Sequence, residues 1–170
     1  MILLGLGSNL SSSFGDRFKN IDLAISYLKK YKIRLIKKSS YYETPSYPNI
    51  AKPKFINVII GIESNLQPLD LAPILIGIEE ALERKRDQKN DPRTCDIDII
   101  DYNGQIIDFK YKNLDFTVPH KKLAYRNFVL FPLQEILPEW KHPKTKVHIN
   151  VLIRNLSNED KKSILKINKS

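Results

Sequence analysis

Hydrophobic and polar positions follow one another along this chain in blocks whose periods separate strands from helices. Four mainly apolar runs rich in β-formers predict β-strands at 1–7, 33–42, 55–63 and 95–102. Two longer runs carry apolar residues at close to the helical period and predict α-helices at 14–32 and 69–84. Pro68 precedes the second run, where it suits the first turn of a helix.

The resulting order is strand, helix, strand, strand, helix, strand. It predicts an α+β fold with a ferredoxin-like βαββαβ sheet. After the last strand, Asn103-Gly104 is a strong hairpin turn signal that leads into 105–107. We therefore expect a C-terminal hairpin added to the ferredoxin-like core.

The rest of the C-terminal part predicts short helices at 128–136 and 148–155. No internal repeat or linker divides the chain, and its 170 residues suit one domain. We expect a single domain at 1–156, followed by a polar tail at 157–170 that frays.

Two segments between the predicted elements should be loops. The first, 44–54, contains three prolines, which cannot donate to a β-ladder. The second, 85–92, is polar and charged and has no apolar anchor, so we expect a mobile loop.

Composition narrows the class of protein. Lys and Arg number 28 against 19 Asp and Glu, a formal net charge of +9, which favours an anionic partner or a solvated basic surface. The single cysteine, Cys95, excludes a disulfide within the chain. We see no signal peptide and no apolar run of membrane-spanning length, so we expect a cytoplasmic protein that binds no membrane.

The most informative segment contains Asp96 and Asp98, two residues apart on a predicted strand. Both carboxylates then point to one face, where they repel each other unless a cation lies between them. Magnesium suits such a pair, because it combines a few carboxylates with phosphate oxygens and water. The alternative is that one aspartate forms a turn or cap and the other is solvated.

Basic residues flank this pair. Arg93 lies just upstream, and Arg84 and Arg86 follow the second predicted helix. Arginine recognises phosphate oxygens in a planar, bidentate manner, although a cationic helix end would also explain two of them. His120 and Arg126 follow a rigid proline and could reach anionic oxygens. The P-loop and dinucleotide-binding patterns are both absent.

An ordered set of motifs resembles the hydroxymethyldihydropterin pyrophosphokinases between about Leu4 and Pro143. The motifs, in chain order, are Gly7-Ser8-Asn9-Leu10, Tyr42-Glu43-Thr44-Pro45, Phe55-Ile56-Asn57, Pro92-Arg93-Thr94-Cys95-Asp96-Ile97-Asp98 and Val118-Pro119-His120 with Arg126 and Phe128. The resemblance implies an ATP-dependent pyrophosphokinase of folate synthesis that transfers pyrophosphate to 6-hydroxymethyl-7,8-dihydropterin and releases AMP. We also expect a monomer.

The resemblance also implies the residues that act on ATP. Two magnesium ions would lie on Asp96 and Asp98, with Arg84 and Arg93 beside them in catalysis. The other nucleotide contacts would come from Glu79, Arg86, Arg93, Ile99, Thr117, His120 and Arg126. The loop 85–92 would close over both substrates.

The pterin would lie between two rings. The resemblance assigns Phe55 and Phe128 to the stack, Asn57 to the polar edge, and Thr44 and Pro45 to loop contacts. Three positions depart from the common pattern of the family: Ile76, Lys121 and Asn90, where glutamine, tyrosine and tryptophan are frequent. Asn90 would cover the pterin less well than a tryptophan.

Two other readings remain open. A ferredoxin-like RNA-binding module would suit the basic charge, but it needs an aromatic-rich strand that we do not find, so we expect no nucleic acid partner. Another two-metal nucleotide-dependent transferase, such as a nucleotidyltransferase, also uses paired aspartates. Such an enzyme places Gly-Ser about a dozen residues before the pair, whereas Gly7-Ser8 lies far from Asp96.

Overall fold

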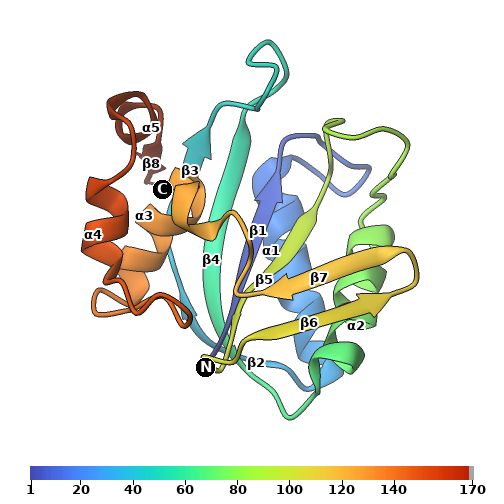
Figure 1. Cartoon of the computed structure of the whole chain (residues 1–170). Coiled ribbons are helices and arrows are strands. Elements are labelled where there is room, and N and C mark those ends of the chain that lie inside the picture. The colour runs from blue at the N-terminus through green and yellow to red at the C-terminus, as the bar shows by residue number, and fades with distance from the viewer. Residues whose placement is uncertain (169–170) are drawn as a thin grey trace.

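The computed structural model describes residues 1–168 and has a central sheet with helices on both faces (Figure 1). The strand order is β5-β1-β4-β3-β8, with β2 also paired to β4, and all these pairs are antiparallel. The strands are β1 Ile2–Ser8, β2 Arg34–Lys38, β3 Tyr41–Thr44, β4 Phe55–Glu63, β5 Asp96–Tyr102 and β8 Leu165–Ile167. The ferredoxin-like plan predicted from the sequence is confirmed.

The helices form two layers. Figure 1 shows α1 (Arg17–Leu28) and α2 (Pro68–Ala81) over one face, and α3 (Asn127–Ile136) and α4 (Ile149–Arg154) beside the other. The remaining helical elements are two 3₁₀ turns, η1 and η2, and one short helix, α5: Lys29–Tyr31, Leu123–Tyr125 and Asn158–Lys162. None of the helices within residues 1–168 has the length and apolarity needed to cross a bilayer.

The hydrophobic core is divided by the sheet. Because successive strand side chains point to opposite faces, β1 sends Leu4 toward α1 and α2, and Leu3 toward α3 and α4. Ile60 and Ile59 of β4 divide in the same way. With both faces covered, β4 is buried from its second to its eighth residue, which explains its continuous apolar run.

The strand expected at 33–42 is two strands, β2 and β3, so this prediction is wrong in part. The break lies at Ser39, whose backbone N–H donates to Ile59 O at 2.9 Å. The Ser39 hydroxyl accepts from Ile59 N at 3.0 Å in place of a backbone carbonyl. A serine side chain that bonds to the neighbouring backbone in this way interrupts the regular ladder.

The hairpin expected after 95–102 is also only partly correct. The Asn103-Gly104 turn forms, with both residues at positive φ (52° and 73°) and Gln105 N donating to Tyr102 O at 3.0 Å. The chain then leaves β5, and β6 (Ile107–Tyr111) pairs with β7 (Leu114–Val118) in a separate two-stranded sheet. Ile107 and Phe109 of β6 pack against the core under α2, which draws the strand away from β5.

The frayed tail predicted from Ser157 is wrong for residues 157–168. This segment forms α5 and β8, and β8 extends the sheet by pairing with β3. Asn127 at the start of α3 donates from Nδ2 to Asp160 O at 2.7 Å and to Ser163 Oγ at 3.1 Å. The tail therefore supports the helix that follows Arg126. Residues 169–170 lie outside the described part of the chain.

Candidate active site

One face of the sheet carries the two aspartates next to a bare stretch of β1. Gly7 pairs with Asp96 on one side and with Asn57 on the other, and Gly5 pairs with Asp98. Directly opposed residues of antiparallel strands share a face, so these side chains surround the glycines. A Cβ at Gly7 would lie 3.5 Å from Phe55 Cδ1 and 3.6 Å from Asn57 Oδ1. Glycine thus leaves a flat floor between the carboxylates and β4.

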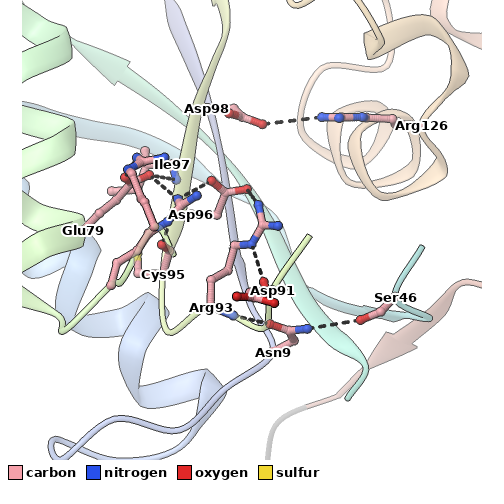
Figure 2. Close-up of polar contacts among 12 residues, drawn as sticks. Asn9, Ser46, Glu79, Asp91, Arg93, Cys95, Asp96, Ile97, Asp98 and Arg126 are labelled. Carbon is pink, nitrogen blue, oxygen red and sulfur yellow. Dashed lines mark hydrogen bonds and ion pairs between the residues drawn. The ribbon is translucent and has the colours of Figure 1, made fainter. Parts of the chain in front are cut away.

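Asp96 lies between two arginines, Arg84 and Arg93, and Figure 2 labels the second of them. Its Oδ1 is 2.6 Å from Arg84 Nη1, and its Oδ2 is 3.3 Å from Arg93 Nη1. Burial opposes ionisation of Asp96, but the charges of Arg84 and Arg93 outweigh it, so the pKa of this carboxyl lies below its usual range. Asp96 is therefore an ionised carboxylate at neutral pH.

Glu79 of α2 is a buried carboxylate that binds the side chains of Arg84 and Arg86. It is 2% exposed and accepts from Arg84 Nη1 at 2.9 Å, from Arg86 Nη2, and from Ile97 N at 2.7 Å. Burial, followed by the charge of Asp96, raises the pKa of Glu79 to about 7. This buried carboxylate ties the end of α2 to the start of β5 and fixes both guanidinium groups.

Asp98 shares the strand face of Asp96 but contacts a different pair of residues, His120 and Arg126. Its Oδ2 is 3.5 Å from Arg126 Nη1 and 3.8 Å from His120 Nε2 (Figure 2 draws the first contact). Burial and then the charge of Asp96 raise the pKa of Asp98 to about 7. Burial and then Arg126 lower the pKa of His120 to about 4, so its imidazole is neutral at pH 7.

The donor set suits magnesium with phosphate. Two carboxylates share one face, and burial together with the charge of Asp96 raises the pKa of Asp98 despite the neighbouring arginines, so an added cation would favour its ionised form. Within residues 1–168 no group of three or more His, Cys, Asp or Glu could form an all-protein metal cage. Magnesium needs no such cage, since it keeps water and substrate phosphates in its shell.

A cavity of about 340 Å³ lies against the α2–β5 loop. Its walls are mainly polar and basic: residues 84–91, Arg93, and Leu114 of β7. A basic cavity next to two carboxylates suits a polyphosphate with bound metal. A hollow of about 460 Å³ near Arg34 is larger, but Arg34 pairs with Glu63, at the end of β4 opposite to Phe55.

The rings assigned to the pterin lie beside the arginines. The Arg93 guanidinium carbon is 5.8 Å from the Phe55 ring centroid, and that of Arg126 is 5.3 Å from the Phe128 centroid. Both distances fall within the range of cation–π contacts. Each ring thus presents a face that a cation already occupies and that a flat ligand could share.

Asn57 differs from its expected role. Its side-chain NH₂ donates to Tyr42 O at 3.1 Å and to Thr44 Oγ1 at 2.9 Å, so both N–H groups are used within the protein. The carbonyl Oδ1 points toward Gly7. Asn57 therefore offers an acceptor to a ligand on this floor, rather than the donor and acceptor expected from its sequence. Thr44 is buried and acts by fixing Asn57, and Pro45 follows it at the loop entrance.

The structure does not bring every expected nucleotide residue into the cluster. Ile99 is 4% exposed and packs in the core under α1 and α2, on the face of β5 opposite to Asp98. Thr117 lies on β7 and donates to Asp108 Oδ1 at 2.7 Å. Neither side chain contacts the aspartates or the arginines around them in the described contacts.

Two residues that sequence reasoning did not assign to the site lie beside it. Asn9 and Ser46 form a buried hydrogen-bonded pair that reaches Arg93 (Figure 2). Asn9 belongs to the Gly7-Ser8-Asn9-Leu10 motif, which was the available signal. Ser46 carried none.

The chain resembles known proteins along most of its length. The family model described as 7,8-dihydro-6-hydroxymethylpterin-pyrophosphokinase matches residues 3–138. The 2-amino-4-hydroxy-6-hydroxymethyldihydropteridine pyrophosphokinase of Methylorubrum extorquens is 35% identical over 138 residues, which cover 80% of this chain and 82% of that protein. The folic acid synthesis protein FOL1 of Dictyostelium discoideum is 35% identical over 158 residues.

The FOL1 match covers 93% of this chain but 23% of the longer protein. Among solved structures, Plasmodium falciparum HPPK-DHPS with pteroate superposes with a TM-score of 0.78 at 15% identity, covering 99% of this chain and 48% of that chain. This structural match supports the fold alone. The family model and the Methylorubrum relative show more: the chain belongs to the 7,8-dihydro-6-hydroxymethylpterin-pyrophosphokinase family, the ATP-dependent pyrophosphokinases of folate biosynthesis.

Proposed function

We propose that this chain transfers the β,γ-pyrophosphate of ATP to the hydroxymethyl group of 6-hydroxymethyl-7,8-dihydropterin and releases AMP. One observation carries the proposal. Asp96 contacts Arg84 and Arg93, which line a cavity of about 340 Å³, Asp98 shares its strand face, and the Phe55 ring lies across Gly7 from Asp96. A polyphosphate and a flat heterocycle can therefore meet at the two carboxylates.

On the nucleotide side, Arg84 and Arg93 would release Asp96 and bind phosphate oxygens when the ligands arrive. Without ligands they neutralise Asp96. Asp96 and Asp98 would hold two magnesium ions, which supply charge neutralisation for the phosphates when bound. The two guanidinium groups then turn from Asp96 to phosphate oxygens, where they stabilise the charge that develops as the bond to AMP breaks. Glu79 keeps Arg84 and Arg86 within reach.

On the pterin side, Phe55 and Phe128 would stack on the ring faces and Asn57 Oδ1 would accept a hydrogen bond from the ring edge. In the proposed pose the hydroxymethyl oxygen would lie near Asp98. That oxygen attacks the β-phosphorus, its proton is released, and the bond from the β-phosphorus to the oxygen retained by AMP breaks. The family relation and the positions of these side chains support this order of events.

The test is a product assay. The protein is incubated with magnesium and ATP, with and without 6-hydroxymethyl-7,8-dihydropterin, and nucleotides are separated by chromatography. We expect AMP to appear in step with pterin pyrophosphate and only when the pterin is present. Release of inorganic pyrophosphate instead would indicate a nucleotidyltransferase. A separate RNA-binding assay with and without magnesium tests the remaining reading: magnesium-independent RNA binding without turnover would favour the RNA-binding module.

A cytoplasmic, monomeric enzyme without a membrane or nucleic acid partner is also part of the proposal. It follows from the composition and the resemblance. Size-exclusion chromatography with light scattering tests the monomer, and fractionation of cells that produce the protein tests its location.

A further inference from the structure

Asn9 lies just after β1 and is 3% exposed. Its side chain makes three hydrogen bonds to two distant segments. Nδ2 donates to Ser46 Oγ and to Pro53 O, both at 3.1 Å, and Oδ1 accepts from Arg93 N at 2.7 Å. Figure 2 shows this amide between Ser46 and Arg93. Both N–H groups and the carbonyl oxygen are therefore occupied.

The bonds to Arg93 are paired. Besides the side-chain contact, the backbone N–H of Asn9 donates to Arg93 O at 3.0 Å. Asn9 thus holds both the N–H and the C=O of Arg93, which leaves the guanidinium as the part of Arg93 that can move. That guanidinium contacts Asp96 and lies over the Phe55 ring. A fixed backbone under a movable guanidinium suits a residue that turns from a carboxylate to a phosphate.

The bonds to the other side fix the β3–β4 loop at both ends. Ser46 Oγ also donates to Pro53 O at 2.5 Å. Each of Ser46, Pro53 and the amide of Asn9 is therefore hydrogen-bonded to the other two, and these three groups form one set. Pro53 lies two residues before Phe55 at the start of β4. The position of the Phe55 ring relative to the floor therefore depends on this set.

We propose that Asn9 is a positioning residue that holds Arg93 on the phosphate side and Phe55 on the pterin side in one fixed relation to Asp96. The proposal rests on the proposed function and extends it. A side chain that joins the β1–α1, β3–β4 and α2–β5 segments couples the two substrate sites, so its loss should affect both. Small displacements of reacting groups are costly in enzymes, since about 1 Å can reduce the rate by about 100-fold.

The test compares three alanine variants. Asn9→Ala removes all three bonds. Ser46→Ala removes the two hydrogen bonds of the Ser46 hydroxyl, to Asn9 Nδ2 and to Pro53 O, but leaves the bond from Asn9 to Pro53 O and the acceptor for Arg93. Asn20→Ala is the matched control, because Asn20 is also a buried asparagine that holds the β1–α1 loop. Asn20 does so through Leu10 O and Ser12 Oγ, and not through Arg93 or Pro53.

For each variant, kcat and the KM of both substrates are measured, together with the melting temperature and the calorimetric affinity for a non-hydrolysable ATP analogue with magnesium. We expect Asn9→Ala to lower kcat/KM by about 10- to 100-fold and to raise both KM values. Ser46→Ala should raise the KM for the pterin while that for ATP stays close to wild type. Asn20→Ala should lower the melting temperature alone.

Equal kinetic losses in the Asn9→Ala and Asn20→Ala proteins would overturn the proposal, since both would then act only through stability. An Asn9→Ala effect confined to one substrate would overturn it as well. The calorimetric measurement needs no turnover. If the wild-type protein released no AMP, the proposed function would fail, whereas the role of Asn9 would still be decided by whether Asn9→Ala, unlike Asn20→Ala, loses affinity for the ATP analogue.

Discussion

Asp98 Oδ2 lies 3.5 Å from Arg126 Nη1, and this contact joins β5 to the segment that enters α3. The same arginine lies over the Phe128 ring. The carboxylate proposed to bind metal and a ring proposed to bind pterin are therefore linked through one guanidinium. In the proposed function, a magnesium ion on Asp98 would compete with Arg126 for this carboxylate, and Arg126 would then be able to turn toward a phosphate and away from the Phe128 ring.

The first prediction concerns the two aspartates. Replacing either Asp96 or Asp98 by Asn should lower kcat by at least about 100-fold, because each variant loses a charged ligand of the ions that neutralise the phosphates. The fold should persist, since both side chains lie at the edge of the core with partly exposed carboxylates. Steady-state AMP release and circular dichroism provide the measurements.

A surface aspartate serves as the control for this prediction. Asp115 on β7 pairs with Lys110 at 3.4 Å, and both side chains are well exposed. Asp115→Asn should leave kcat unchanged, because exposed ion pairs contribute little. Near-normal turnover in both active-site variants would show that the pair is not the metal site.

The placement of Asp96 and Asp98 on one face could be predicted from the sequence, because it depends only on the two-residue period of a strand. The break between β2 and β3 could not, since it depends on Ser39 bonding to Ile59, which lies on another strand. The contacts of Asn9 could not be predicted from the sequence for the same reason. Its partners Ser46, Pro53 and Arg93 are 37, 44 and 84 residues away, and only the folded chain brings them together.

The prediction that the C-terminal segment frays was wrong for a related reason. Its composition is polar, which predicts fraying, but its order comes from contacts with α3 and β3. Asn127 donates to Asp160 O, and Lys166 Nζ lies 3.7 Å from Glu135 Oε1. Pairing of β8 with β3 satisfies its backbone at the edge of the sheet. None of these partners is visible in the local pattern of the tail.

The second prediction concerns the protonation of His120. Its pKa of about 4 lies below the value of about 6.5 for a free histidine, because burial and then Arg126 disfavour the imidazolium. Between these two pH values the unfolded chain binds the proton and the folded protein does not, so the contribution of His120 to stability is lost as the pH falls. NMR titration of the His120 ring should give a midpoint near 4.

Bound ATP should change this midpoint. If the phosphates draw Arg126 away and approach His120, they favour the charged imidazole, and the midpoint should rise. The comparison is made with magnesium and a non-hydrolysable ATP analogue. A midpoint near 6.5 in the free protein would contradict the buried, neutral state, and an unchanged midpoint with the analogue would place the phosphates elsewhere.

The third prediction concerns Phe128. Phe128→Ala should weaken pterin binding by about 10-fold while changing ATP affinity little, because in the proposed arrangement the pterin, and not the adenine, stacks on that ring. Calorimetry with each ligand provides the measurement. Tyr31→Ala, an exposed ring on η1, should change neither affinity. Equal losses for both ligands, together with a lower melting temperature, would instead identify Phe128 as a core residue of the α3 layer.

The last prediction concerns the loop 85–92, which lines the basic cavity. No apolar side chain anchors it. Near its start Arg86 bonds to the buried Glu79, and near its end Lys52 makes two polar contacts that the sequence did not predict. Lys52 Nζ donates to Asn90 O at 2.9 Å and lies 3.7 Å from Asp91 Oδ1. Both contacts are partly exposed, so they hold the loop weakly. We expect the part of the loop after Arg86 to open freely without ligands and to close when ATP and pterin are both bound.

Closure would bring Arg86 and Arg93 onto the phosphates and exclude water, which strengthens each charge interaction in the site. Hydrogen exchange of residues 85–92 tests this in the free protein, with an ATP analogue, and with analogue plus pterin. Protection should appear fully only with both ligands. Lys52→Met should speed exchange in the free protein, because it keeps the length of the side chain but removes its charge and donor. Strong protection without ligands would show a preformed loop, and the closing motion would then have no place in the mechanism.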